Sequence, residues 1–299
     1  MQTIPITQIN VNDKRFCISY PLEDDILLAS IKKIGIIQPL ILLAQSPYIV
    51  VTGFKRLEAA LSLGLANIPC IIVNIDEKNA LLRSIHDNTG RLLNIIEKAY
   101  CIEKMLHMGF SKEETYEIMT LLSLNRHEKI IKRLLDIANA DETMKNFILK
   151  KDLSMQNAES LLRFTPEEKN RIIEMLIPAH TTESVMREIL RMFHIIKVKN
   201  GAINFSIMVG ADNAYELKTR LKNLTHPILS SLEKGLKDIK LKCALPPNID
   251  IKVDPFFEKE YIDILIRAKN PDEIREALIK LTGVLDVGYI GSIFGLAKD

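Results

Sequence analysis

Two adjacent cations, Lys55 and Arg56, open a segment whose chemistry suits phosphate binding. They follow the apolar run 48–51 and the pair Thr52-Gly53, and apolar residues recur at helical spacing after them. This order predicts a strand that turns through glycine into a helix, where unpaired backbone N–H groups suit an anion. Cations at a helix N-terminus oppose the helix dipole, so a bound phosphate would account for them. A turn glycine followed by two solvated cations is the alternative interpretation.

The composition is that of an ordinary folded protein rather than a disordered one. The chain has 299 residues, of which 47% are hydrophobic and 26% charged, and its net charge is only +2, so nucleic-acid binding has to come from local basic patches. Four scattered cysteines form no CxxC pair, which argues against a zinc site or a disulfide framework. No stretch reaches the roughly 20 apolar residues of a membrane helix, and the start lacks the pattern of a signal peptide. We therefore expect a cytoplasmic protein with no membrane partner.

The first 93 residues have to supply the scaffold for the glycine turn. Helical periodicity predicts a helix over 21–35 that ends at Gly35. Alternating or β-rich runs predict strands over 3–9, 38–43, 48–53 and 67–75. Short connections between such mixed elements indicate an α+β domain.

Residues 94–195 have an almost wholly helical pattern. Asn94-x-x-Glu97 and Ser111-x-x-Glu114 both match the capping box that begins a helix. Thr165-Pro166 places a proline at a first helical position. An all-α middle domain is therefore expected.

Residues 196–299 return to a mixed pattern, and we expect a small α+β domain there. Strands are predicted over 202–209 and 248–254, and helices over 213–240, 256–268 and 271–282. An apolar stripe recurs every three or four residues from Leu217 to Ile239, although Pro227 argues against one continuous helix. The stripe needs a partner, which is either the domain's own core or a second subunit.

Three ordered segments carry a family resemblance. "SIKKIGIIQPLILL" (30–43), "VVTGFKRLEAALSLGLANIPCIIV" (50–73) and "DNTGRLLNIIEKA" (87–99) resemble the G-x-x-Q-P, G-E-R-R-x-R-A and E-N-x-x-R segments of the ParB partition proteins. The resemblance extends over residues 1 to about 195. It implies a ParB/sulfiredoxin-like nucleotide-binding domain at 1–93 and a helix-turn-helix DNA-binding domain at 94–195, followed by a C-terminal domain at 196–299 that dimerises.

The resemblance also implies a ligand and the residues that hold it. Members of the family bind CTP with Mg²⁺ and close as a clamp on DNA. The residues expected around CTP are Gly35, Ile37, Gln38 and Pro39 near the base, Gly53, Lys55 and Arg56 at the phosphates, and Asp87, Asn88 and Arg91 at the triphosphate. Asp87 and Asn88 would also hold the metal, because carboxylate and amide oxygens are ligands that Mg²⁺ accepts. Both residues are also common turn formers, which is the alternative.

The chain departs from the family pattern around the glycine turn. Phe54 replaces the acidic residue, Lys55 replaces an arginine, and Glu58 stands in place of the downstream arginine. The sulfiredoxins, which share the fold, have their catalytic cysteine where this chain has Phe54, so that activity is rejected. Whether CTP is hydrolysed, even weakly, stays open.

The segment 109–138 reads as two helices with a break at 123–125. The second is rich in cations, and a short helix pair with a basic second member fits a helix-turn-helix whose second helix enters the major groove. The turn is longer than the family's by two residues. The expected DNA contacts are Asn125, Arg126, Lys129, Lys132 and Arg133. A solvated basic face on a packing helix is the alternative.

These features favour a ParB-like, CTP-responsive DNA-binding protein of chromosome or plasmid partition, or of related transcription control. The resemblance implies a nucleoid-associated homodimer with a ParA-type ATPase as partner. One alternative is a phosphotransferase or nuclease on the same scaffold, with Glu58 or His86 as general base. Another is an interaction module of a mobile element that binds neither nucleotide nor DNA.

Overall fold

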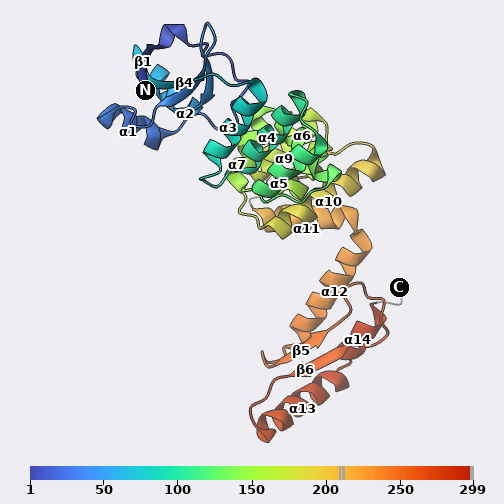
Figure 1. Ribbon diagram of the computed structural model, residues 1–299. Helices are drawn as coiled ribbons and strands as arrows, with labels where there is room; N and C mark the ends of the chain where they lie inside the picture. The colour runs from blue at the N-terminus through green and yellow to red at the C-terminus, as the bar shows by residue number, and fades with distance from the viewer. Residues whose placement is uncertain (209, 211–212, 297–299) are drawn as a thin grey trace. The chain divides into compact units, whose positions relative to one another are not determined.

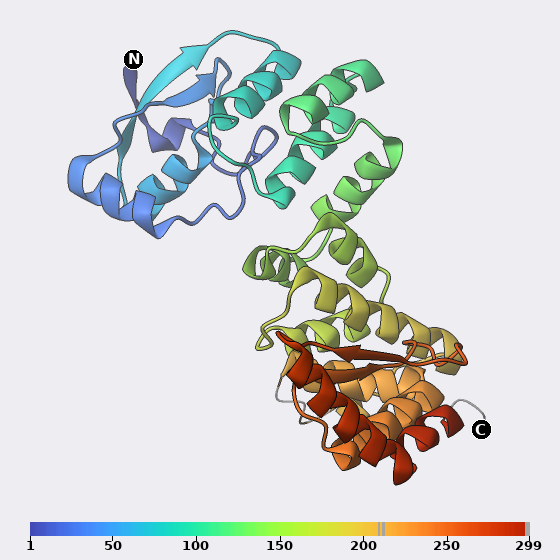
Figure 2. The same cartoon turned by 90° about the horizontal axis from the view of Figure 1, so that it is seen from below.

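The computed structural model describes residues 1–208, 210 and 213–296, and the chain forms two compact units, 1–177 and 178–299. Figures 1 and 2 show the mixed elements at the N-terminus, the helices that follow them, and the small C-terminal sheet (Figure 1, Figure 2). This confirms the expected α+β, all-α and α+β composition along the chain. The boundary between the two compact units lies at 177/178. The boundaries predicted from the sequence lie at 93/94 and 195/196, and the division into three domains stays a prediction.

A four-stranded sheet in the order β1-β4-β2-β3 organises the N-terminal region. β2 runs parallel to β4, while β1–β4 and β2–β3 are antiparallel pairs. The four strands predicted from the sequence are present, and residues 6–8 of the first turn into a 3₁₀ helix instead of continuing it. The elements are β1 (Gln2–Pro5), η1 (Ile6–Gln8), α1 (Asp25–Ile34), β2 (Leu40–Leu43), β3 (Ile49–Thr52), α2 (Phe54–Ser62), β4 (Asn67–Val73) and α3 (Glu77–Asn88).

The core of this region fixes where β3 meets α2. Every residue of β2 and β3 is buried, as is Leu57 on α2. α2 packs on α1 and β2, and α3 packs on β3. The end of β3, the start of α2 and the helix α3 therefore belong to one packed structure.

Six helices complete the first unit. Both predicted capping boxes form, at Asn94/Glu97 and Ser111/Glu114, and Pro166 occupies the first turn of its helix as expected. α6 packs on α4 and α8, and α7 packs on α9. The helices are α4 (Ile95–His107), α5 (Lys112–Leu121), α6 (Glu128–Ala138), α7 (Glu142–Lys151), α8 (Met155–Leu162) and α9 (Pro166–Leu176).

The second unit contains a two-stranded antiparallel sheet with helices. Ile249 and Ile251 of β5 form a core with Ala277 and Leu281 of α13 and with two isoleucines of α14. Its elements are α10 (Glu183–Asn200), η2 (Phe205–Met208), α11 (Ala214–Thr225), α12 (Pro227–Cys243), β5 (Ile249–Lys252), β6 (Asp263–Ile266), α13 (Pro271–Asp286) and α14 (Tyr289–Gly295).

Two predictions for the second unit were wrong. The strand expected over 202–209 is a 3₁₀ helix at 205–208, with residue 209 outside the described residues, and the helix expected over 256–268 contains β6. Pairing of β6 with β5 supplies backbone hydrogen bonds that local periodicity does not reveal. The helix predicted over 213–240 is divided at Pro227, as expected. Pro227 is the first residue of α12, a position where its missing N–H costs nothing.

Among the described residues, no helix taken singly has the length and apolarity to cross a membrane. α13 and α14, which meet at a 64° bend, satisfy these two criteria only as a pair.

Candidate nucleotide site and nucleic-acid interface

The glycine turn between β3 and α2 requires glycine for two reasons. Gly53 has φ 99°, a left-handed conformation that other residues adopt at a cost. A Cβ there would lie 2.9 Å from Leu40 Cγ and 3.3 Å from Cζ of Arg56. Because Gly53 offers no capping side chain and α2 has no acidic residue in its first turn, the first N–H groups of α2 keep their affinity for an external anion.

Thr52 adds a polar atom that sequence reasoning missed. Its side chain is fully buried, and its hydroxyl has no hydrogen-bond partner within the described residues. Buried hydroxyls are normally bonded. A threonine at the end of an apolar strand gives no signal of this in the sequence, because a surface strand end would look the same.

Arg56 brings the three resembling segments together. Its Nη1 donates to the carbonyl oxygens of Gln38 at 2.6 Å and Pro39 at 2.8 Å. Burial lowers the pKa of Arg56, and the nearby charge of Asp87 opposes that shift. An arginine remains charged in such a site, so a half-buried positive charge lies where segments 30–43, 50–73 and 87–99 meet.

Lys55 lies in a different setting. Its Nζ is 3.3 Å from Asp24 Oδ2, and Asp24 also accepts from the Leu27 N–H as the N-cap of α1. The hydrogen bond from Leu27 lowers the pKa of Asp24, and the ion pair with Lys55 lowers it further. A cavity of about 110 Å³ beside Lys55 is also lined by Glu23, Asp25 and Glu58. Because this acidic setting already balances the charge of Lys55, we expect Lys55 to attract a phosphate less strongly than Arg56 does.

The end of α3 holds the residues expected at the metal. Asp87 is exposed, and Asn88 donates to the Ser84 carbonyl at 2.9 Å while its Oδ1 accepts from Arg91 at 3.1 Å. Arg91 also forms a two-pronged ion pair with Glu97, at 2.7 and 2.6 Å, which raises the pKa of Arg91. No group of three or more potential ligand side chains occurs in the described part of the chain. The residues fit Mg²⁺ in the way this ion usually binds, with Asp87 and Asn88 as the protein ligands and phosphate and water as the others.

The segment expected near the base begins at the end of α1. Gly35 terminates α1 with φ 73°, and its N–H donates to the Ile31 carbonyl at 2.9 Å. Ile37 is 76% exposed, so the core does not account for its apolar side chain. Contact with the planar base of a nucleotide would account for an apolar side chain at this position.

The basic helix pair forms with its turn at 122–127. Ser123 adopts φ 57° in this turn, and His127 caps α6 by accepting the Lys129 N–H at its Nδ1. Histidine is not among the usual capping residues, so the residue type gives no signal of this cap. α6 begins at Glu128, after two of the expected contact residues, Asn125 and Arg126.

The five expected DNA contacts do not have the same surroundings. Asn125, Arg126, Lys129 and Lys132 are exposed, and Arg126 donates to Thr120 Oγ1 at 2.6 Å.

Arg133, by contrast, is half-buried, with Nε 2.5 Å from Glu159 Oε2 of α8. Glu128, the acidic residue that begins α6, is paired with Lys112 of α5, which lowers the pKa of Glu128. Internal pairing thus leaves the exposed start of α6 positive.

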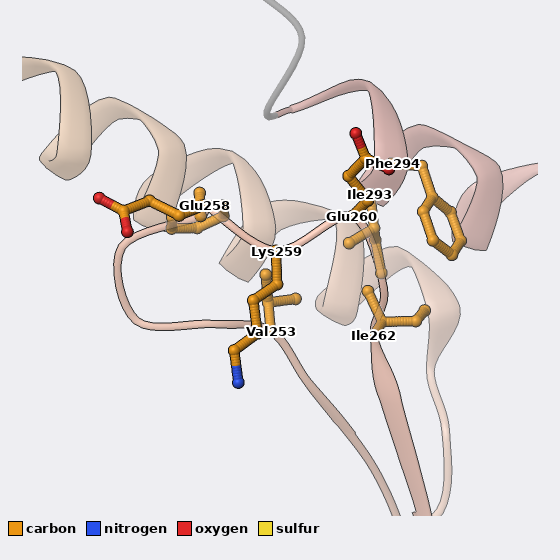
Figure 3. A pocket seen from close by; sticks show the side chains of 8 residues that line it. Val253, Glu258, Lys259, Glu260, Ile262, Ile293 and Phe294 are labelled. Carbon is orange, nitrogen blue, oxygen red and sulfur yellow. The ribbon is translucent and has the colours of Figure 1, made fainter.

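A hollow in the second unit is less suited to these ligands. Figure 3 shows Ile262, Ile293 and Phe294 on one side of it, with the Glu258 side chain directed away (Figure 3). Its volume is about 370 Å³, and Glu258 and Glu260 outnumber the one cation in its lining, Lys259. Net negative charge disfavours phosphate and nucleic acid, so the corner after β3 remains the candidate.

Comparison with known proteins bears on the N-terminal region. The family model described as the ParB N-terminal domain matches residues 1–89, which hold the glycine turn and the end of α3. This part of the chain is thus similar to the N-terminal domain of ParB proteins.

Similar ParB-related proteins come from several bacteria. A probable chromosome-partitioning protein ParB of Vibrio cholerae is 25% identical over 172 residues, which are 55% of this chain and 57% of that protein. The chain thus spans less than two thirds of the Vibrio protein. A nucleoid occlusion protein of Listeria monocytogenes is 27% identical over 212 residues, 67% of this chain and 72% of that one.

Two solved structures of a C-terminally truncated ParB from Caulobacter crescentus are also similar. One, complexed to the centromeric parS site, covers 64% of this chain and 99% of its own at 16% identity, with a TM-score of 0.36. The other, complexed with CTP-gamma-S, covers 59% and 98% at 19% identity, with a TM-score of 0.27.

Proposed function

We propose that this chain is a DNA-binding protein whose N-terminal domain responds to CTP and which acts in chromosome or plasmid partition, nucleoid occlusion or related transcription control. The observation that carries the proposal is the convergence of the three ParB-like segments on Arg56. Its guanidinium holds the carbonyls of Gln38 and Pro39 and lies within electrostatic reach of Asp87. Gln38, Arg56 and Asp87, which lie 18 or more positions apart in the sequence, thereby come together at one corner.

In this proposal the corner binds the triphosphate. The N–H groups that begin α2 and the Arg56 guanidinium attract the phosphates, and the Thr52 hydroxyl supplies one more polar atom. A Mg²⁺ held by Asp87 and Asn88 would neutralise phosphate charge. Ile37 covers the base. Nucleotide then stabilises whichever arrangement of the domain it binds more tightly, since only differential affinity shifts populations.

DNA binding is proposed for the start of α6. Exposed Lys129 and Lys132 supply phosphate contacts, which give affinity but no sequence information. Asn125 and Arg126, in the turn before α6, are the candidates for base contacts. A ParA-type ATPase is proposed as a further partner on the basis of the resemblance to ParB proteins alone.

Homodimerisation is proposed for the C-terminal domain. Ile274, Leu278 and Leu285 form an apolar stripe on α13 that is 45 to 53% exposed, and Ile264 on β6 is 41% exposed. Light scattering on the full chain should give twice the mass of 34.0 kDa. A monomer at tens of micromolar would contradict this part of the proposal.

The central test is a titration of the full chain with labelled CTP, with and without Mg²⁺ and DNA. We expect saturable, Mg²⁺-dependent binding that Arg56→Ala weakens and that ATP does not compete away. Absence of binding at millimolar CTP would contradict the nucleotide response while leaving DNA binding to be judged by its own salt-sensitive gel shift.

The alternative of a phosphotransferase or nuclease gains no support. Glu58, one of its two candidate bases, lines the small acidic cavity with Asp24 and Lys55. A general base has to lie within hydrogen-bond reach of the proton it removes.

A further inference from the structure

Tyr20 connects the N-terminal domain to two of the helices that follow it. Its N–H donates to Glu97 Oε1 at 3.2 Å, and its carbonyl accepts from Asn94 Nδ2 at 2.7 Å, both at the start of α4. Its hydroxyl donates to Glu142 Oε2 at 2.8 Å and lies 3.2 Å from Asn146 Oδ1, both on α7. One residue thus links the loop before α1 to α4 and to the helix directly after α6.

The side chain of Tyr20 is held in this position. Its ring packs edge-on against Tyr100 of α4, with 6.1 Å between centroids and an interplanar angle of 84°. Lys145 of α7 lies 5.1 Å from the other ring's centroid, that of Tyr100. Burial and the hydrogen bond to Glu142 raise the pKa of Tyr20, so its hydroxyl remains a donor at neutral pH.

Glu97 connects Tyr20 to the candidate nucleotide site. This carboxylate is 1% exposed and accepts two bonds from Arg91, one from the Asn94 N–H and one from the Tyr20 N–H. Arg91 in turn donates to Asn88 Oδ1. A continuous series of hydrogen bonds therefore runs from the end of α3 to α7.

We propose that Tyr20 is the positioning residue that couples nucleotide binding at the end of α3 to the DNA-binding helices, an inference that rests on the proposed function. A phosphate that engages Arg91 competes with Glu97 for that guanidinium, and a Mg²⁺ that engages Asn88 Oδ1 competes with Arg91 for that oxygen. A buried carboxylate does not tolerate loss of its guanidinium partner, so Glu97 and the backbone of Tyr20 have to rearrange with it. The hydroxyl of Tyr20 carries that rearrangement to α7, which follows the recognition helix.

The test uses the full chain and the Tyr20→Phe variant, which loses only the bonds to α7. The measured quantity is the ratio of DNA affinities with and without saturating CTP and Mg²⁺, for the wild type and for Tyr20→Phe. We expect this ratio to move toward one by about threefold or more in the variant, while CTP affinity without DNA and DNA affinity without CTP stay within about twofold. Tyr48→Phe removes a phenol hydroxyl from a residue of the same domain that lines a hollow with Gln8 and Pro47, and it should leave the ratio unchanged.

A second measurement separates coupling from a merely local contact. Combining Tyr20→Phe with Glu142→Ala should reduce the ratio no further than either change alone, because the two partners form one interaction. A wild-type ratio above one that Tyr20→Phe leaves intact overturns the inference alone. A wild-type chain that binds no CTP, or binds it without altering DNA affinity, overturns both the inference and the proposed nucleotide response.

Discussion

The cations after β3 and the cations of α6 differ in what they contact. Arg56 donates to two backbone carbonyls and Lys55 pairs with Asp24, so protein groups set the position of each. Lys129 and Lys132 on α6 are exposed and form no ion pair within the described residues. A positioned guanidinium suits a ligand of defined shape, whereas exposed lysines suit a polyanion whose phosphates are bound by charge alone.

The same contrast holds for the acidic residues. Near the glycine turn, carboxylates such as Asp24 and Glu58 gather beside Lys55. On the helix pair, Glu128 at the start of α6 is paired with Lys112 of α5, and Arg133 further along α6 is paired with Glu159 of α8. Acidic residues thus balance the positive charge of Lys55 near the glycine turn, whereas the exposed lysines of α6 keep their positive charge.

The largest effect that separates the regions is expected for Gly53→Ala. The left-handed backbone and the 2.9 Å approach to Leu40 should together cost about 2 kcal/mol or more of unfolding free energy, measured by urea denaturation. Gly90→Ala is the control, because an added Cβ there meets no heavy atom of the described residues within 4 Å and the backbone is not left-handed. Equal stability of the two variants would contradict the packing of the corner.

Arg56→Ala should weaken CTP binding by about tenfold or more, since charge-assisted hydrogen bonds are worth about 1.5–3 kcal/mol. Lys55→Ala should cost only about threefold, because Asp24 already engages that ammonium. Isothermal titration with Mg²⁺ measures both. A larger loss for Lys55→Ala than for Arg56→Ala would reverse the ranking drawn from the structure.

Removing Lys129 or Lys132 should lower the salt dependence of DNA binding. Each lost phosphate contact reduces the slope of log affinity against log salt by about one, measured by fluorescence anisotropy over a series of salt concentrations. Arg133→Gln should leave this slope nearly unchanged, because Arg133 is engaged by Glu159. A slope change as large as that of Lys129→Gln would mean that Arg133 contacts DNA.

The smallest effect is expected from the charge of Asp24. Its pKa is lowered in the folded state by the Leu27 N–H and by Lys55, so its charge stabilises the fold above the unfolded pKa of about 3.9 and that contribution is lost as pH falls through the folded pKa. Asp24→Asn keeps a capping side chain. The variant should be less stable by under about 1 kcal/mol at pH 7, with solvent screening reducing the value, and the difference should vanish as pH falls below the lowered, folded-state pKa of Asp24. A difference that persists at low pH would point to the cap rather than the charge.

The sequence by itself determined the features that depend on neighbouring residues. The capping boxes at Asn94 and Ser111, the helix end at Gly35, the break at Pro227 and the strand–glycine–helix turn at Gly53 all follow from local backbone chemistry. The sequence also shows the order of the three ParB-like segments, and this order predicts the resemblance to the ParB family.

Only the tertiary structure decided which partners those residues meet. The carbonyls held by Arg56, the pairing of Arg133 with Glu159 and the contact of Tyr20 with α7 join residues 17 to 126 positions apart, and no local pattern encodes such distances. The misjudged segment at 256–268 shows the same limit, because β6 is a strand through its hydrogen bonds to β5. Local propensity is a weak preference that packing and pairing override, and the chemistry of a charged side chain depends on what it is packed against.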